Sequence, residues 1–255
     1  MSRTMRAASA SACVAAFVAT FSPPAFGAEY TVSPMRLELS RAARSGVVTL
    51  TNTGASRIDF QMTAMEWTQD AQGVDHYAET GEIIFFPKIL TLVPNEDRVI
   101  RVGAKSAPAA SERTFRLFIE RIPAPEPEPL SPGAHIAVNI RFALPIFVKP
   151  VLRKTQGEFT NVALARSELT VALRNAGNEH FLLDDGIAVS GRTARGEELF
   201  AQRISDRYLL AGIVKVYMAS IAKDICVRLA TLEVTAKTQQ FTLSRKLDVD
   251  PASCG

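Results

Sequence analysis

The middle of the sequence alternates apolar and polar side chains over a long run, residues 134–150. Successive side chains of an extended strand point to opposite faces, so this alternation predicts one long strand with a single apolar stripe. The stripe consists of Ile136, Val138, Ile140, Phe142 and Leu144, and the other face carries Ala137, Asn139, Arg141 and Ala143. A stripe of this length either packs on the strand's own core or offers an edge to another chain, because natural proteins cover or interrupt such edges.

Shorter apolar or alternating runs fill the chain from Tyr30 onward, and none of them keeps a helical period. Residues typical of turns separate these runs. The pattern predicts strands at 30–39, 46–51, 58–67, 83–92, 97–102 and 114–122, and, after the long strand, at 169–173, 181–189, 208–216, 223–234 and 241–249. About seven short strands in roughly 120 residues are typical of an immunoglobulin-like β-sandwich.

Two segments resemble each other across the end of the long strand. Residues 47–54 and 169–177 both run an apolar strand into an Asn-x-Gly turn, and a second strand follows each. This similarity favours two similar sandwiches in series, with 148–152 as the connection. The proline-rich segment 123–133 is predicted to be extended and exposed, because proline fixes φ and lacks an N–H donor.

The N-terminal segment, residues 1–27, has the features of a secretory signal peptide. Two arginines precede an apolar run at 8–21, and small residues follow at 25–27. The run is too short for a permanent membrane anchor, and no later segment reaches the length of a transmembrane helix. We therefore predict an exported chain with an N-terminal domain at 28–150 and a C-terminal domain at 151–255. Loss of the signal lowers the net charge from +3 to about +1, which favours neither a nucleic-acid nor a membrane-surface partner.

Two cysteines remain once Cys13 leaves with the signal peptide. Cys226 and Cys254 are then the only intrachain pair that could form, and export to an oxidising compartment would permit a disulfide between them. Two free thiols are the open alternative. Neither cysteine has the nearby cysteine or histidine that metal sites and redox motifs require.

Catalytic motifs are missing from the sequence. There is no Gly-x-Ser-x-Gly, Walker loop, Gly-x-Gly-x-x-Gly or two-histidine helical motif. Ser220 and Lys223 match the Ser-x-x-Lys spacing of acyl-transfer enzymes, but the partner motifs of those enzymes are absent. Asp184 and Asp185 precede a glycine and are typical of a solvated turn. We predict no enzyme activity and assign no catalytic, cofactor-binding or metal-ligating residue.

Taken together, these features resemble the periplasmic chaperones of chaperone–usher pilus assembly, over nearly all of the exported chain. The segments that carry the resemblance are 32–36 (Val-Ser-Pro-Met-Arg), 48–52, 98–102, 115–123, 173–180 and 209–213. The resemblance implies an all-β protein with two immunoglobulin-like domains in series, L- or boomerang-shaped. It also implies a periplasmic location, pilin subunits and an outer-membrane usher as partners, and no cofactor.

In that family the chaperone lends a strand late in its first domain to a pilin that lacks its last strand. The resemblance implies that Ile136, Val138 and Ile140 are the subunit-binding residues here, with Phe142 as an extension. Burial of each such side chain contributes about 1.5–3 kcal/mol before the costs of ordering are subtracted. Self-association in the absence of a client would be one way to cover the same edge.

The family also binds the pilin's C-terminal carboxylate with two basic residues in the cleft between the domains. Arg36 matches the first of these, whereas the family lysine falls on Pro145 in this sequence. That departure indicates a divergent branch of the family, associated with archaic or alternative pili. Arg116 is the candidate for the second anchor, followed by Arg101, Arg121 and Lys149. An arginine suits the role because its planar fork can meet a carboxylate through two hydrogen bonds.

Two other classes of protein remain as alternatives. One is a secreted immunoglobulin-like adhesin or pilus structural subunit, which would polymerise where a chaperone would stay small. The other is a secreted enzyme, which would need a pocket of convergent polar groups that no motif in the sequence indicates.

Overall fold

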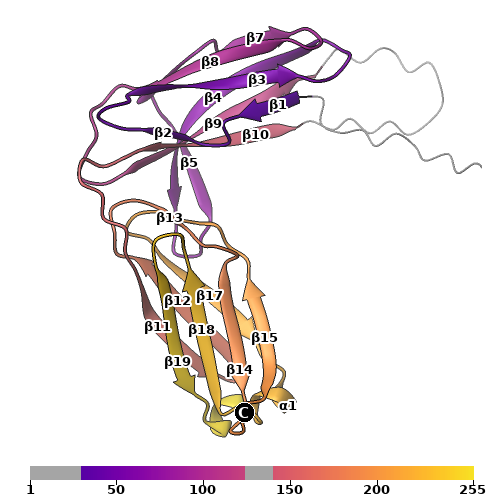
Figure 1. The fold of residues 1–255 in the computed structure, drawn as a ribbon, viewed down its shortest axis with the longest axis vertical. Helices are drawn as coiled ribbons and strands as arrows, with labels where there is room; N and C mark the ends of the chain where they lie inside the picture. Colours follow the sequence, from indigo (N-terminus) through magenta and orange to yellow (C-terminus); the bar gives the residue numbers. More distant parts are fainter. Residues whose placement is uncertain (1–29, 124–139) are drawn as a thin grey trace, which may run out of the picture.

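The structure is a computed structural model and describes residues 30–123 and 140–255. Two β-sandwiches follow one another along the chain and meet at an angle, so that the molecule is L-shaped (Figure 1). The predicted fold class is therefore confirmed. The predicted signal peptide, most of the proline-rich segment and the first part of the predicted long strand lie outside the described residues. Within the described part of the chain, no helix is long and apolar enough to span a membrane.

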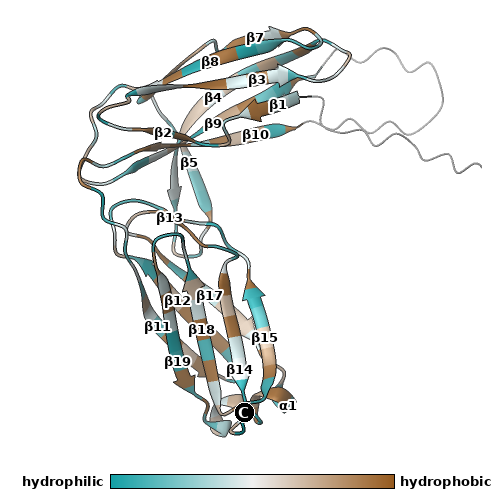
Figure 2. Ribbon diagram, in the orientation of Figure 1, coloured by the Kyte–Doolittle hydropathy of each residue, from teal (hydrophilic) through white to brown (hydrophobic). Residues whose placement is uncertain are grey.

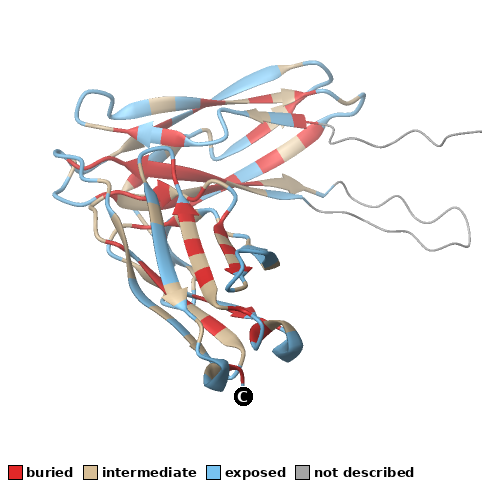
Figure 3. Cartoon of the chain, turned by 60° about the horizontal axis from the view of Figure 1, so that its bottom comes forward, coloured by how far each residue is buried: buried red, intermediate tan, exposed pale blue. Residues whose placement is uncertain are grey.

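The first sandwich consists of two sheets, with strand orders β1-β3-β8-β6 and β2-β10-β9-β4-β5, and with β7 paired to β4. Its strands are β1 Tyr30–Ser33, β2 Leu37–Leu39, β3 Ser45–Asn52, β4 Ile58–Gln69, β5 Asp75–Glu79, β6 Ile83–Phe86, β7 Ile89–Leu92, β8 Asp97–Ala104, β9 Arg113–Ile122 and β10 Arg141–Val148. The alternation of hydropathy along these strands (Figure 2) becomes an alternation of burial (Figure 3). In β4, for example, Phe60, Met62 and Ala64 face the core. The hydrophobic effect thus fixes which face of each strand points inward.

Two predicted strands of the first sandwich are each divided by a proline. The predicted strand 30–39 becomes β1 and β2 on either side of Pro34, and 83–92 becomes β6 and β7 on either side of Pro87. Proline cannot donate a backbone hydrogen bond to a ladder, so the two halves pair with different sheets. β1 pairs with β3 and β2 with β10, while β6 pairs with β8 and β7 with β4. β5 was not predicted, because its mostly exposed residues carry no apolar stripe.

The second sandwich has sheets with strand orders β11-β12-β17 and β15-β14-β18-β19, and a short β13-β16 pair. Its elements are β11 Gly157–Ala165, β12 Glu168–Asn175, β13 Phe181–Leu182, β14 Ile187–Arg192, β15 Glu198–Ile204, β16 Tyr208–Leu209, β17 Val214–Ser220, α1 Lys223–Cys226, β18 Thr231–Lys237, β19 Thr242–Asp248 and the 3-10 helix η1 Pro251–Cys254. β11 and β15 were not predicted, because most of their residues are exposed or only half-buried.

Three predicted strands of the second sandwich are wrong in extent. The predicted strand 208–216 divides into β16 and the start of β17, and 223–234 contains α1 followed by β18. The predicted strand 181–189 is interrupted by a turn at Asp185 and Gly186, which have φ values of 62° and 78°. A Cβ on Gly186 would lie 2.0 Å from the carbonyl oxygen of Ile204, so only glycine fits there.

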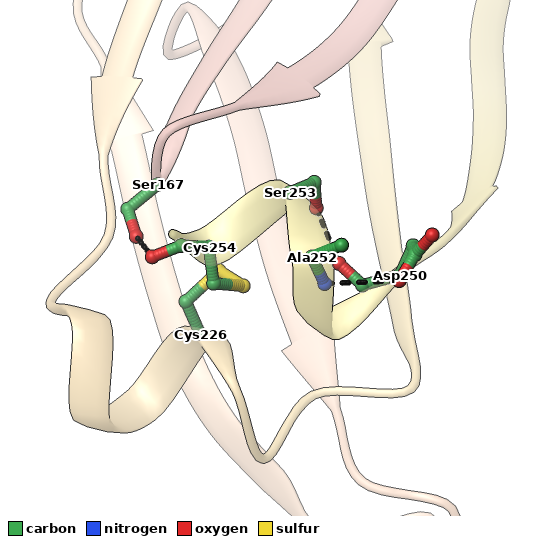
Figure 4. Close-up of a disulfide and its surroundings, with 6 residues drawn as sticks. All are labelled: Ser167, Cys226, Asp250, Ala252, Ser253 and Cys254. Atoms are coloured by element: carbon green, nitrogen blue, oxygen red, sulfur yellow. Dashed lines mark hydrogen bonds between the residues drawn. A yellow bond between two sulfur atoms is a disulfide. The ribbon is translucent and has the colours of Figure 1, made fainter.

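Cys226 and Cys254 form a disulfide between α1 and η1, with their Cα atoms 5.8 Å apart (Figure 4). Both cysteines are buried in the core of the second sandwich. The hydroxyl of Ser167 donates a hydrogen bond to the carbonyl oxygen of Cys254 at 3.0 Å, and Asp250 caps the start of η1 by accepting from the amide of Ala252 at 2.9 Å. These contacts attach the end of the chain to the second sandwich.

The two Asn-x-Gly segments of the sequence form the same corner in the two sandwiches. Asn52 and Asn175 are both fully buried. Asn52 donates to the carbonyl oxygens of Ser56 and Leu92, and Asn175 donates to those of Glu179 and Leu209. Each asparagine also accepts from the amide of the glycine two residues later, at 2.9 and 3.0 Å. The internal similarity of the sequence thus corresponds to a repeated set of hydrogen bonds.

Candidate functional site

β10 has a partner along the whole of one edge but only along part of the other. It pairs antiparallel with β9 from Arg141 to Val148, and parallel with β2 only from Ile146 to Val148. Among the described strands, the 141–145 margin on the β2 side therefore has no partner. Ile140, which precedes the strand, is 43% exposed. An open margin of this kind can pair with the strand of another chain.

The apolar stripe of the predicted long strand faces its own core over most of β10. Leu144, Ile146 and Val148 are buried in the core of the first sandwich, and Phe142 packs partly against it. The stripe thus covers its own core from Leu144 onward, and at Phe142 it does so only in part. At Ile140 the side chain leaves this core. Ile136 and Val138 lie outside the described residues, so their assignment to a partner stays a prediction.

Arg116 lies directly across from Pro145 in the β9–β10 ladder, on the face of the sheet that is turned away from the core. Its guanidinium carbon is 3.8 Å from the centre of the Trp67 ring, and its Nη1 donates to the carbonyl oxygen of Ala143 at 3.2 Å. Its Nη2 is 3.7 Å from Oδ2 of Asp75. The guanidinium is therefore fixed by a cation–π contact and a β10 carbonyl, beside a carboxylate of β5.

Asp75 is held by two neighbours on the same hairpin. The amide of Gln69 donates to its Oδ1 at 3.1 Å, and the hydroxyl of Tyr77 donates to its Oδ2 at 3.1 Å. Burial raises the pKa of Tyr77, and the negative charge of Asp75 raises it further, against the opposing effect of Arg116. Tyr77 therefore remains a hydrogen-bond donor at neutral pH.

Arg36 comes directly before β2, whose residue Leu37 pairs with Ile146, and it lines a polar pocket of about 230 Å³ between the two domains. Its side chain is 47% exposed, and its Nε is 3.4 Å from Oε1 of Glu38. Lys149, Arg153 and Glu179 also line this pocket. An exposed ion pair such as Arg36–Glu38 contributes little stability, so Arg36 is available to another carboxylate at small cost.

Lys149 is the centre of a buried ionic network that joins the domains. Its Nζ is 3.2 Å from Glu112, 3.6 Å from Glu179 and 3.8 Å from Glu38. Arg153 donates to Glu179 at 2.7 Å, and Thr155 donates to the same carboxylate. Burial tends to raise the pKa of Glu179, but the hydrogen bonds from Arg153 and Thr155 and the charge of Lys149 lower it overall. Lys149 is thus already engaged by three carboxylates, which weakens its case as a free anchor.

Aromatic side chains connect the surroundings of Arg116 with the ionic network. Phe147 on β10 stacks on His180 with ring centres 3.6 Å apart, and its ring is 6.0 Å from that of Trp67. The backbone amide and Nδ1 of His180 lie 2.8 and 2.7 Å from Oε2 of Glu112. Trp67, Phe147 and Leu210 form a small apolar core between the domains. One face of the β2–β10–β9–β4 sheet therefore carries both arginine sites and the domain junction.

Comparison with known proteins places this chain in a family. Residues 29–153 match the family model of the pili and flagellar-assembly chaperones, PapD N-terminal domain. The first domain of the chain, which this match spans, belongs to this family. A search of curated proteins with the sequence finds no match.

Solved structures of pilus chaperones share the fold of this PapD-family chain. A chaperone–tip adhesion subunit complex from archaic Csu pili of Acinetobacter baumannii matches with 15% identity and a TM-score of 0.59, covering 85% of this chain and 97% of the other. The class 5 fimbriae chaperone CfaA matches with 12% identity and a TM-score of 0.55, covering 85% and 98%. The Pseudomonas aeruginosa CupB2 chaperone matches with 14% identity and a TM-score of 0.51, covering 86% and 100%. At these low sequence identities, the structural similarity shows that the fold is shared and nothing more.

The remaining anchor candidates of this PapD-family chain lie elsewhere. Arg101 is on the outer face of the other sheet, across from Val47 on one side and Phe86 on the other. Arg121 lies near Tyr30, whose pKa is raised by burial and lowered to a smaller extent by the arginine charge. Neither is among the residues that line the junction pocket. Of the four candidates, Arg116 alone lies across the ladder from the position of the family lysine.

The sequence did not indicate the ionic network at the junction. Glu112 and His180 are 68 residues apart, and no local motif connects them. Only the bend between the sandwiches brings them together. In residues 30–123 and 140–255, no group of three or more histidine, cysteine, aspartate or glutamate side chains is arranged to hold a metal ion.

Proposed function

We propose that this PapD-family protein is a periplasmic chaperone that binds pilin subunits by strand addition and delivers them to an outer-membrane usher. The observation that carries the proposal is the margin of β10 at 141–145, with which no strand in residues 30–123 and 140–255 pairs on the β2 side, next to the exposed side chain of Ile140. Unpaired backbone groups and adjacent apolar side chains are what an incomplete sandwich needs to close its groove.

The proposed donor segment consists of the residues before β10 and the start of β10 itself. Ile136, Val138 and Ile140 supply the side chains that enter the groove of the subunit. Phe142 contributes less, because it already packs partly on the core of its own sandwich. Burial of three such side chains contributes about 1.5–3 kcal/mol each, and ordering of the segment offsets part of this.

Arg36 and Arg116 are proposed to anchor the C-terminal carboxylate of the subunit. Arg36 is supported by its exposed side chain at the junction pocket. Arg116 is supported by its place opposite Pro145 and by the fixed orientation of its guanidinium. The replacement of the family lysine by Pro145 favours the archaic or alternative branch of the family.

Complexes of other proteins with this fold support the choice of partner. One solved structure contains the Csu chaperone with a tip adhesion subunit, and another contains the Salmonella enterica SafA pilin in complex with the SafB chaperone. The proposal includes removal of residues 1–27 as a signal peptide. It requires no enzymatic activity, cofactor, nucleic acid or membrane insertion.

The test is co-expression of the chain with pilin subunits encoded beside it, followed by isolation of periplasmic one-to-one complexes. Ile140→Asp and Val138→Asp should each abolish complex formation, because a buried unpaired carboxylate opposes burial of the strand. Val47→Asp is the matched control: Val47 is 48% exposed, close to the 43% of Ile140, but it lies on β3 in the other sheet. It should leave the complex intact.

Thermal unfolding of each variant separates loss of binding from loss of fold. If Ile140→Asp and Val138→Asp fold normally and still bind the subunit, strand lending through this segment is wrong. If the purified wild-type chain polymerises without a subunit, the alternative of a pilus structural subunit is favoured instead.

A further inference from the structure

The anchor candidate Arg116 is only partly satisfied in the free protein. Its Nη1 is hydrogen-bonded to the carbonyl oxygen of Ala143, and its plane is fixed by the ring of Trp67. Its Nη2 faces Asp75 at 3.7 Å, which is an ion-pair distance but too long for a hydrogen bond. The side chain of Arg116 is only 13% exposed. Solvent ions therefore screen its charge poorly, although its pairing with Asp75 is incomplete.

Two hydrogen bonds hold Asp75 at its distance from Arg116. Its two oxygens accept hydrogen bonds from Gln69 and Tyr77, both at 3.1 Å. A closer approach would strain or break these bonds. Asp75 therefore neutralises Arg116 from beyond hydrogen-bonding range, with Tyr77 beside both groups, and a carboxylate that came closer to Nη2 would bind it more strongly than Asp75 does.

The position of Asp75 depends on both domains. The amide of Gln69 that holds Asp75 also donates to the carbonyl oxygen of Tyr208 at 3.2 Å, and its Oε1 accepts from the amide of Leu210 at 3.1 Å. At the tip of the same hairpin, the amide of Val216 is 3.4 Å from the carbonyl oxygen of Ala71. The β4–β5 hairpin reaches the second sandwich in this way (Figure 1).

We propose that Asp75 is an internal substitute for the terminal carboxylate of the client: it pairs with Arg116 in the free protein and lowers the affinity for that carboxylate. This inference rests on the proposed function. A client carboxylate that reaches Nη2 must share Arg116 with Asp75, and two like charges near one cation repel each other. Asp75 thus sets how strongly the chaperone distinguishes a free chain end from any other apolar segment.

The experiment uses synthetic peptides of the last 20 or so residues of the pilin subunit that co-purifies with the chaperone, with either a free carboxylate or a carboxamide at the end. Binding of both peptides is measured by calorimetry with the wild-type protein, Asp75→Asn and Asp75→Ser. Both substitutions should raise the affinity for the carboxylate peptide about five-fold and leave that for the amide peptide unchanged.

Two controls isolate the effect of Asp75. Asp59→Asn removes a carboxylate of similar exposure on β4, paired with Arg57 and not with Arg116, and should change neither affinity. Arg116→Gln should reduce the preference for the carboxylate peptide to what Arg36 provides, and Asp75→Asn should no longer raise the affinity in that background.

An unchanged or reduced affinity for the carboxylate peptide overturns the inference, as does an equal gain for both peptides. In those outcomes a wild-type preference for the carboxylate peptide would leave the proposed function intact. If the wild-type protein binds neither peptide, the proposed function fails together with the inference.

Discussion

The corners at Asn52 and Asn175 have the same internal hydrogen bonds but different surroundings. Asn52 lies in the first sandwich, where its carbonyl oxygen accepts from the amide of Asn95 in a turn of the same sandwich. Asn175 makes the matching backbone bonds with Gly212 and Ile213 inside the second sandwich, but the turn that follows it faces the first domain. The asparagine corner therefore stabilises only the fold in the first domain. In the second domain it stabilises the fold and also lies at the contact between the domains.

The difference arises in the residues that follow each asparagine. After Asn175 come Asn178, Glu179 and His180, all of which contact the first domain or the connection. Asn178 donates to the carbonyl oxygens of Ala110 and Leu152 at 2.8 and 2.7 Å. The corresponding residues after Asn52 are Ser56 and Arg57, and Arg57 pairs with Asp59 within its own sandwich. A repeated corner can thus acquire a new role through the polar residues of one short turn.

The largest expected effect comes from removing each asparagine. Asn175→Ala leaves the buried carbonyl oxygens of Glu179 and Leu209 without their donor, and Asn52→Ala leaves the buried carbonyl oxygen of Leu92 and the more exposed one of Ser56. Each substitution also removes the acceptor of one glycine amide, so each should destabilise its domain by about 3–5 kcal/mol, with the larger loss for Asn175→Ala. Denaturant unfolding measures this loss. Only Asn175→Ala should also widen the distribution of interdomain distances in small-angle X-ray scattering. Equal scattering from the two variants would show that the second corner does not support the junction.

A second difference between the domains is the disulfide. Cys226 and Cys254 close a loop with a sequence separation of 28, whose removal should cost about 3 kcal/mol, since the unfolded chain gains conformational freedom. In Cys254→Ser or under reducing conditions, the second domain should unfold at lower denaturant concentration. The unfolding of the first domain serves as the internal control. If the unfolding transitions of both domains shifted to lower denaturant concentration together, the disulfide would not act on the second domain alone.

The smallest expected effect concerns acid. Interactions with Arg153, Thr155 and Lys149 hold the pKa of Glu179 below its usual value, so the folded junction favours the ionised form. The resulting stability is present above the ordinary glutamate pKa of 4.5 and is lost as the pH falls through the lowered value. We expect the interdomain distance, measured by fluorescence energy transfer, to lengthen as the pH falls below about 4.5.

Arg153→Gln should make this change begin at a higher pH, because it removes the strongest hydrogen bond that lowers the pKa of Glu179. Arg57→Gln is the matched control at the first corner, with a side-chain exposure of 64% against 59% for Arg153. It should leave the transition unchanged. A transition that is equal in all three proteins would exclude Glu179 as its cause.

The sequence predicted those strands whose buried face follows directly from the alternation of apolar and polar residues. The alternation along β4 and β10 predicted buried faces, and the two Asn-x-Gly segments predicted two related domains. It failed where a single residue redirects the chain, as Pro34 and Pro87 do, and where a strand such as β5 has no apolar face. Those elements depend on neighbours that are distant in the sequence.

The candidate site was predictable to a lesser extent. Arg36 and Arg116 came from the resemblance, and their role as carboxylate anchors stays a prediction, as do the roles of Ile136 and Val138. Asp75, Glu112 and His180 gave no signal in the sequence, because their importance comes from contacts across the domain junction. Isolated polar residues reveal such contacts only when the bend between the domains is known.

The short parallel pairing of β2 with β10 limits what can be added to the open margin. β2 already occupies the backbone positions beside Ile146, Phe147 and Val148. A visiting strand that pairs with β10 must therefore end before it reaches Ile146, whatever its sequence. β2 thus acts as a physical stop that fixes the alignment of the added strand, and clients of different length would differ only at their far ends.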